Sequence, residues 1–234
     1  MKKYAFFDVD NTIYNGYTAS DIFFFATEKG KMNVNFKNQY LKITDLYRNG
    51  SINYCYAAER VLELYSRSIK GMSKIEVQSL FIELFNQKKE LIFNWVNPVI
   101  NLLKSHDFRV ILISGGPDIA VEYLNEKIGA HKWYATNIEY ISDRYTGRKP
   151  QILDNHNKVK IIKKFIGNKT KSFSLGFGDS SGDIPMLEVV DKAFVVYNDH
   201  HPDMMKYSKK KKWFVFKTPD EVIKEVEKAV IRNL

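Results

Sequence analysis

The sequence predicts an α/β fold: a Rossmann-like parallel sheet with helices on both faces, into which an all-helical segment is inserted. After residue 98, short apolar segments typical of buried strands alternate with segments of helical periodicity, which indicates a parallel sheet. Between residues 15 and 97, by contrast, the apolar residues follow helical spacing alone. The length of 234 residues is sufficient for one such core with a substantial insertion.

The individual elements follow from these patterns in chain order. The first strand covers residues 4–10, an apolar run that ends in two acids. The insertion is expected to contain helices at residues 21–29, 36–48, 54–66 and 73–88. Ser73 and Glu76 have the spacing of a capping box at the start of the last one. The later elements are a strand at 109–114, a helix at 118–127, a hairpin of 135–141 with a partner near Tyr145 and a turn at 143–144, a helix at 157–166, a strand at 172–177, a helix at 185–190, strands at 193–197 and 213–216, and a helix at 219–231.

Composition and charge exclude several classes of protein. The single cysteine, Cys55, excludes an intramolecular disulfide, and no run approaches the roughly 18 apolar residues that a membrane span requires. Asp8 and Asp10 interrupt the N-terminal apolar stretch, which is therefore not typical of a signal peptide, and we expect a cytoplasmic protein. The formal charge is +9, but the lysines are scattered apart from the run at 209–212. We interpret this charge as a solvated surface, and nucleic acid is not an expected partner.

Acidic residues follow two of the predicted strands. Asp8 and Asp10 stand at i and i+2 and share one face, where their carboxylates repel each other unless a cation lies between them. Asp179 and Asp183 follow the strand at residues 172–177 in the same way. Since ligands bind at the carboxyl ends of parallel strands, these acids indicate a site for a hard cation such as Mg²⁺.

A third strand end, Ser114-Gly115-Gly116, offers a hydroxyl and, at a helix start, backbone N–H groups suited to a phosphate. With Asp8-x-Asp10-x-Thr12 before it and Gly-Asp179-x-x-x-Asp183 after it, the chain resembles the haloacid dehalogenase (HAD) superfamily of phosphatases. The segment after Ser114 is similar to subfamily IB, which contains the phosphoserine phosphatases. The resemblance implies a HAD-like catalytic core of residues 1–14 and 97–234 and a helical cap of residues 15–96.

The resemblance also implies roles for these residues. Asp8 would be the nucleophile, and Asp10 would act first as general acid and then as general base. The superfamily uses a lysine to bind phosphate, and both Lys158 and Lys149 fit its pattern, Lys158 being favoured. Phosphate would be bound by Ser114, Gly115 and Lys158, and Mg²⁺ by Asp8, the backbone carbonyl of Asp10, Asp179 and, through water or as a brace, Asp183.

Three departures from the phosphoserine phosphatases concern the substrate. Tyr17 stands where those enzymes carry the glutamate that receives the serine amine, Arg60 lies one residue from their cap arginine, and Gly182 replaces an asparagine. We therefore expect a magnesium-dependent phosphomonoesterase that acts on a small phosphorylated metabolite other than phosphoserine through a phospho-aspartyl intermediate. Two alternatives are a phosphatase or phosphotransferase acting on a nucleic-acid end, lipid head group or phosphoprotein, and a binding protein that has kept only the fold.

Overall fold

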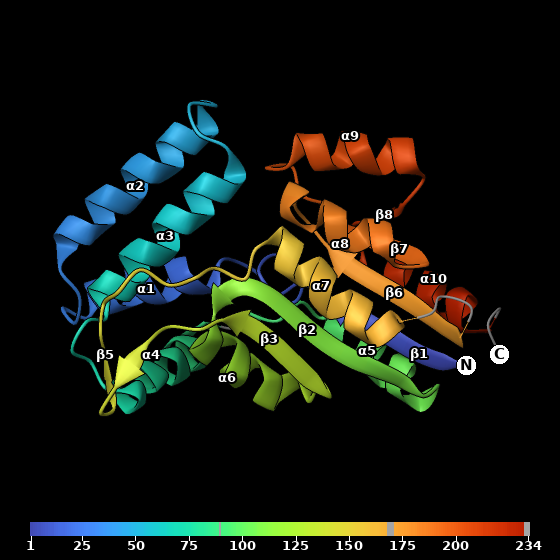
Figure 1. The fold of residues 1–234 in the computed structure, drawn as a ribbon, viewed down its shortest axis with the longest axis horizontal. Helices are drawn as coiled ribbons and strands as arrows, with labels where there is room; N and C mark the ends of the chain where they lie inside the picture. Colours follow the sequence, from blue (N-terminus) through green and yellow to red (C-terminus); the bar gives the residue numbers. More distant parts are fainter. Residues whose placement is uncertain (89, 168–170, 232–234) are drawn as a thin grey trace.

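A six-stranded parallel sheet forms the centre of the computed structural model, which describes residues 1–88, 90–167 and 171–231 (Figure 1). The strand order is β3-β2-β1-β6-β7-β8, so the first strand of the chain is central. These strands are β1 (Lys2–Phe7), β2 (Phe108–Pro117), β3 (Lys132–Thr136), β6 (Ser172–Gly178), β7 (Lys192–Val196) and β8 (Phe214–Phe216). A separate hairpin consists of β4 (Tyr140–Ile141) and β5 (Arg144–Tyr145).

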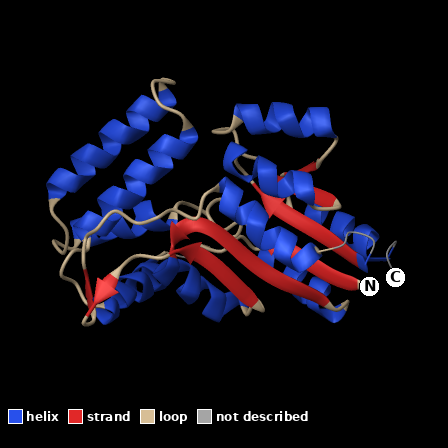
Figure 2. Cartoon of the chain, viewed as in Figure 1, coloured by secondary structure: helices blue, strands red, loops and turns tan. Residues whose placement is uncertain are grey.

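Helices surround the sheet and form the segment that follows β1, as Figure 2 shows in blue. The predicted α/β class with helices on both faces is therefore confirmed. The helices are α1 (Thr18–Glu28), α2 (Val34–Arg48), α3 (Tyr54–Ser68), α4 (Lys74–Gln87), α5 (Val96–Ser105), α6 (Asp118–Ile128), α7 (Asn155–Ile166), the short 3₁₀ helix η2 (Ser181–Asp183), α8 (Ile184–Val189), α9 (Pro202–Lys211) and α10 (Pro219–Ile231).

Side chains of β1 alternate between two apolar cores, as expected of a strand buried on both faces. Tyr4 and Phe6 pack in the core that also contains buried residues of α7, α8 and α9. Ala5 and Phe7 point to the opposite face and join the larger core, which includes residues of α5, α6 and α10. On that face the ring of Phe7 stacks on Phe177 with centroids 4.2 Å apart. The nucleophile predicted at the end of β1 thus follows a strand held rigidly on both sides.

Two antiparallel connections join α1–α4 to the rest of the chain. The backbone N–H of Asn15 donates to the carbonyl of Leu91 at 2.8 Å, and that of Phe93 donates to the carbonyl of Ile13 at 3.0 Å. The chain therefore leaves the sheet after β1 and returns to it before α5 along one path. The capping box of Ser73 and Glu76 is confirmed at the start of α4.

Several predicted elements were wrong in detail. The segment predicted as one strand at 135–141 is divided: β3 ends at Thr136 and belongs to the main sheet, parallel to β2, and only Tyr140–Ile141 forms the hairpin strand β4. The hairpin near Tyr145 is present, but its turn falls at Ser142 and Asp143, whose positive φ angles of 48° and 63° suit a tight β-turn. Helices α5 and α9 were not predicted. In α9 only Met204 and Ser208 are buried, so its apolar periodicity is weak.

Among the described residues, the helices are all too short or too polar to cross a lipid bilayer.

Candidate active site

Three acids that follow strands lie together at the carboxyl edge of the sheet. The backbone N–H of Asp8, directly after β1, donates to the carbonyl of Phe177 in β6 at 2.9 Å. This parallel register places Asp8 beside Asp179, the first residue after β6. Asp183 lies in η2, four residues further on, and all three acids are buried. The structure thus brings together three carboxylates from two neighbouring strand ends.

Lys158 of α7 is the cation within this group of acids. Its Nζ lies 2.5 Å from Oδ1 of Asp8 and 2.9 Å from Oδ1 of Asp183, and the residue is only 5% exposed. Burial alone would lower the pKa of Lys158, but the charges of Asp183 and Asp8 raise it, so the amine stays charged. Lys149, the other lysine considered from the sequence, is exposed and pairs with Glu59. Of the two, Lys158 is the lysine that contacts the acids.

The three carboxylates, which we call the acid cluster, outnumber this one ammonium group. Each of Asp8, Asp179 and Asp183 offers an oxygen, and these oxygens lie within 4.8 Å of one another. The pKa of Asp8 is raised to about 8, first by burial and next by the charge of Asp183, although Lys158 opposes the rise. Burial and the charges of Asp183 and Asp8 raise the pKa of Asp179 well above its ordinary value. Buried oxygen ligands with excess negative charge fit a hard divalent cation.

Hydrogen bonds within the 179–183 turn hold Asp183 in place. Its Oδ2 accepts from the backbone N–H of Asp179 at 3.3 Å, from that of Ser180 at 3.2 Å, and from the hydroxyl of Ser180 at 3.1 Å. Gly178 permits this turn, since a Cβ there would lie 2.7 Å from Cβ of Asp183. Residue 178 must therefore be glycine for Asp183 to fold back against the strand end.

Asp10 and Ser114 meet on the β2 side of the site. Oδ1 of Asp10 accepts from the backbone N–H of Thr18 at 2.8 Å, and this carboxylate is not among the three whose oxygens form the acid cluster. Burial raises the pKa of Asp10 to about 6, although the contacts with Thr18 lower it. A Cβ on Gly116 would lie 3.2 Å from Oδ2 of Asp10 and 3.1 Å from Oγ of Ser114, so the two oxygens converge there.

The helix predicted from Asp118 is confirmed, whereas the strand before it, predicted to end at Ser114, extends to Pro117. Gly115 and Gly116 still belong to β2, which runs to Pro117 with an irregular register beyond Ile113, and α6 begins only at Asp118. The backbone N–H of Gly116 donates to Oγ of Ser114 at 2.9 Å. The bulged strand end, rather than a helix N-terminus, therefore presents the residues at 114–116.

Aromatic residues of the inserted segment lie above the acid cluster. Tyr54, the first residue of α3, packs on Gly182, where a Cβ would lie 2.8 Å from its Cε1. The hydroxyl of Tyr17 lies 3.4 Å from Nε2 of His201. Burial, and next the charges of Asp179 and Asp10, raise the pKa of Tyr17. Arg60 is directed elsewhere: it is exposed on α3 and pairs with Glu63 at 2.7 Å.

Sequence reasoning missed two residues of this site. Asn198 donates from Nδ2 to Oδ2 of Asp179 at 3.1 Å, and Nε2 of the buried His201 lies 3.6 Å from the same oxygen. Both stand in the loop after β7, whose carboxyl end lies at the same edge of the sheet. A strand was predicted at residues 193–197, just before this loop. The rule that ligands bind beyond the carboxyl ends of parallel strands could therefore have drawn attention to the loop.

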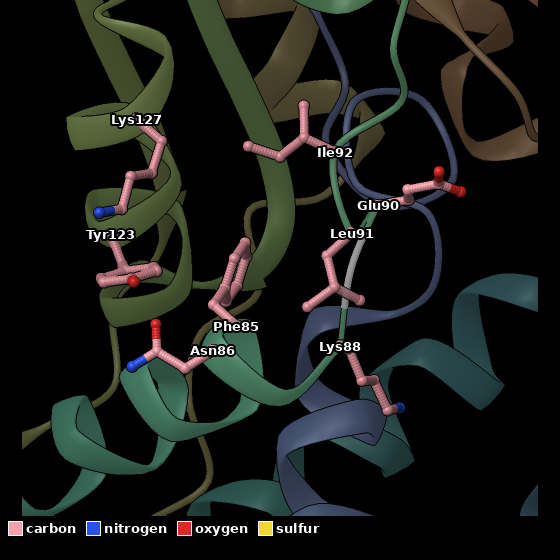
Figure 3. Close-up of a pocket in the computed structure, with 8 residues that line it drawn as sticks. All are labelled: Phe85, Asn86, Lys88, Glu90, Leu91, Ile92, Tyr123 and Lys127. Carbon is pink, nitrogen blue, oxygen red and sulfur yellow. The ribbon is translucent and has the colours of Figure 1, made fainter.

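An open pocket of about 440 Å³ lies apart from these residues (Figure 3). Its walls come from the end of α4, residues 90–92 and α6. The rings of Phe85 in α4 and Tyr123 in α6 meet edge to face, with centroids 4.9 Å apart. None of its lining residues belongs to the acid cluster. They are Phe85, Asn86, Lys88, Glu90, Leu91, Ile92, Tyr123 and Lys127.

Comparison with known proteins agrees with this geometry. The chain is 24% identical over 192 residues to a phosphoserine phosphatase of Archaeoglobus fulgidus, a match that covers 80% of this chain but only half of that protein. It is 26% identical over 190 residues to the phosphoserine phosphatase of Methanocaldococcus jannaschii, with 80% of this chain and 82% of the relative covered.

Among solved structures, a phosphoserine phosphatase carrying an analogue of the phospho-aspartyl intermediate shares the fold. The TM-score is 0.68 at 22% identity, and the alignment covers 96% of this chain and 98% of the other. The profile of the haloacid dehalogenase-like hydrolases matches residues 5–188, a span that contains the acid cluster, Asp10, Ser114 and Lys158. The resemblance predicted from the motifs is thereby confirmed, and the chain belongs to the haloacid dehalogenase-like hydrolase family.

Proposed function

We propose that the protein is a magnesium-dependent phosphomonoester hydrolase that acts on a small phosphorylated metabolite through a phospho-aspartyl intermediate on Asp8. The observation that carries the proposal is the buried contact of Lys158 with Asp8 and Asp183, beside Asp179. Such an arrangement supplies a nucleophile and a cation for phosphate, which a phosphoryl transfer requires. The relatives named above are phosphoserine phosphatases, which supports the reaction class.

In the first step an oxygen of Asp8 attacks phosphorus and the bond from phosphorus to the ester oxygen breaks. Asp10 donates a proton to the departing oxygen, so that the product leaves as an alcohol. In the second step Asp10 takes a proton from water, whose oxygen attacks the phospho-aspartate and releases phosphate. A pKa of about 6 suits Asp10 for both transfers, because it can hold or release a proton near neutral pH.

The remaining residues would bind the phosphoryl group and the metal. Lys158, the hydroxyl of Ser114 and the backbone of Gly115 would hold the phosphoryl oxygens and offset their charge. Asp8, Asp179, Asp183 and the backbone carbonyl of Asp10 would hold Mg²⁺. When bound, Mg²⁺ would favour the ionised form of Asp8 and offset the negative charge of the phosphoryl group. A second cation fits this site, because three buried carboxylates lie around one lysine and burial raises the pKa of Asp8 despite Lys158.

We also propose that residues 15–96 form a cap on a catalytic core of residues 1–14 and 97–234. Two features support this division: the paired connections between Ile13–Asn15 and Leu91–Phe93, and the contacts of Tyr17 and Tyr54 with the core. A cap that closes over the site excludes water and selects the substrate with its own side chains.

The central test is Asp8→Asn. Its amide cannot attack phosphorus as a carboxylate does, so phosphate release from p-nitrophenyl phosphate and from a metabolite panel should fall to background. Circular dichroism should show an unchanged fold. Turnover above background in a correctly folded Asp8→Asn protein would refute the proposed nucleophile. A wild-type protein that hydrolyses no compound would refute the proposal that it is a phosphatase.

The substrate prediction concerns Tyr17. A serine ammonium group enclosed here would lack a carboxylate partner, and an unpaired buried charge costs several kcal/mol, about a thousandfold in selectivity. Phosphoserine should therefore have a kcat/KM far below that of the best compound in the panel, and Tyr17→Glu should raise it relative to that compound. Tyr140→Glu, at a tyrosine that is 48% exposed, is the matched control. Phosphoserine as the best substrate of the wild type would overturn this reading of Tyr17.

A further inference from the structure

The loop after β7 supplies a preorganised donor to Asp179. Nδ2 of Asn198 donates to Oδ2 of Asp179 at 3.1 Å. The same amide accepts at Oδ1 from the backbone N–H of His200 at 3.0 Å, and the backbone N–H of His201 donates to the carbonyl of Asn198 at 3.1 Å. Since its oxygen is engaged within the loop, the amide can present only its nitrogen to Asp179.

His201 closes the same side of the carboxylate. It is 4% exposed, and its Nε2 lies 3.6 Å from Oδ2 of Asp179 and 3.4 Å from the hydroxyl of Tyr17. Its ring meets that of Tyr54 edge to face, with centroids 6.0 Å apart. The imidazole is thus packed between Asp179 and two aromatic residues of the inserted segment.

The three members of the acid cluster are held by different parts of the chain. Asp8 is held by Lys158, and Asp183 by Lys158 and the donors of its own turn. For Asp179, the side-chain donor that the described residues provide is Asn198, from the neighbouring strand's loop. A carboxylate fixed through one oxygen keeps its other oxygen available and loses less rotational freedom when it binds a cation.

We propose that Asn198 and His201 are positioning residues that hold the carboxylate of Asp179 ready for a divalent cation. The proposal rests on the proposed function, because it takes Asp179 to be a metal ligand. It extends the proposed metal site from the motif residues to the loop after β7. Partners of this kind orient a ligand without touching the metal, and their loss typically weakens affinity about 10- to 100-fold.

The test is the affinity of the whole chain for Mg²⁺ alone, measured by isothermal titration calorimetry without substrate. Asn198→Ala, and Asn198→Leu, which better preserves side-chain volume, should each weaken binding about tenfold or more. His201→Phe, which keeps a ring but no ring nitrogen, should weaken it as well. His200→Ala removes the exposed neighbouring imidazole and should bind as the wild type does. The melting temperature without metal shows whether each variant is folded.

The possible failures can be told apart. Wild-type binding that is lost in Asp179→Ala but unchanged in folded Asn198→Ala and Asn198→Leu would overturn the positioning role and leave the proposed function intact. A wild type that binds no Mg²⁺ would overturn both. Should Asn198→Ala fail to fold, Asn198→Leu decides the matter, and equal affinity of that variant and the wild type counts against the proposal.

Discussion

The ammonium group of Lys158 contacts both Asp8 and Asp183, and the residue is only 5% exposed. A buried carboxylate that loses such a partner is costly, because the interior offers no water in exchange. Lys158 therefore combines two tasks: it makes the burial of the acids tolerable, and in the proposed reaction it would bind the phosphoryl group. These tasks predict that its replacement affects stability and activity together.

Lys158→Met should lower the free energy of unfolding by about 3–5 kcal/mol and reduce kcat/KM by roughly 100-fold or more. Urea denaturation and steady-state kinetics measure the two effects. The matched control is Lys149→Met, at the exposed lysine that pairs with Glu59, which should leave both quantities unchanged. Equal effects of the two substitutions would show that the site does not depend on Lys158.

Asp10 is predicted to act separately from Asp8. With Asp10→Asn and p-nitrophenyl phosphate, whose leaving group needs no proton, the first step should survive. Hydrolysis of the phospho-enzyme should then slow by about 100-fold or more, because no base takes the proton of water. Rapid acid quenching and intact mass spectrometry should detect the added phosphoryl group. If no phospho-enzyme accumulates while both steps slow equally, Asp10 does not have this role.

Residues at strand ends could be predicted from the sequence, since an acid after an apolar run has a recognisable pattern. Asp8, Asp179 and Asp183 were found in this way, and the structure places them together. Asn198 and His201 were not found, because their contact with Asp179 depends on the path of a loop that carries no periodic signal. Arg60 was selected by alignment alone, and a shift of one residue on a helix turns a side chain by about 100°.

At the scale of elements, the contact of α3 with η2 joins the inserted segment to the candidate site. Tyr54 begins α3 and fits against Gly182 because that residue has no side chain. Helical periodicity predicted α3 well, yet it could not show which residue its N-terminus would contact. The same limit applied to β3, whose place beside β2 is set by sheet pairing rather than by its own composition.

Gly182→Ala should disturb this contact, since its Cβ would lie 2.8 Å from Cε1 of Tyr54. Overpacking of this kind costs about 1–3 kcal/mol, and Tyr54→Ala should remove most of that cost by removing the ring. A double-mutant cycle measured by thermal or urea unfolding should give a coupling of about 0.5 kcal/mol or more. Additive effects of the two substitutions would mean that the residues do not pack as described.

Over the whole molecule, the proposed binding of a metal at the acid cluster would link metal binding to stability. Its three buried carboxylates face one lysine, so a divalent cation that binds only the folded state should stabilise the protein. The fold class and the helical insertion were predictable because they depend on periodicity over many residues. The site's geometry was not, because it arises from residues far apart in the chain, such as Asp8 and Lys158, which are 150 positions apart.

Addition of Mg²⁺ at about 100 times its dissociation constant should stabilise the fold by about 2.7 kcal/mol and raise the melting temperature by several degrees. Excess chelator should reverse the shift and remove activity. Asp179→Ala should melt at the same temperature with and without Mg²⁺, because it lacks one of the proposed ligands. Differential scanning fluorimetry is sufficient, with Asp45→Ala, at an exposed acid of α2 outside the cluster, as the control. Full activity in excess chelator would contradict the metal requirement.

The central position of β1 has a consequence for how the protein is made. Within this sheet β1 is made before its neighbours β2 and β6, which begin only at Phe108 and Ser172. Parallel pairing across such separations is slow, because long stretches of chain must first be closed into loops. A nascent chain that ends before Ser172 already contains Asp8 and Lys158, yet Asp179 has not been synthesised. During translation, Asp8 is therefore made well before Asp179 and Asp183, the two acids that lie beside it in the folded protein.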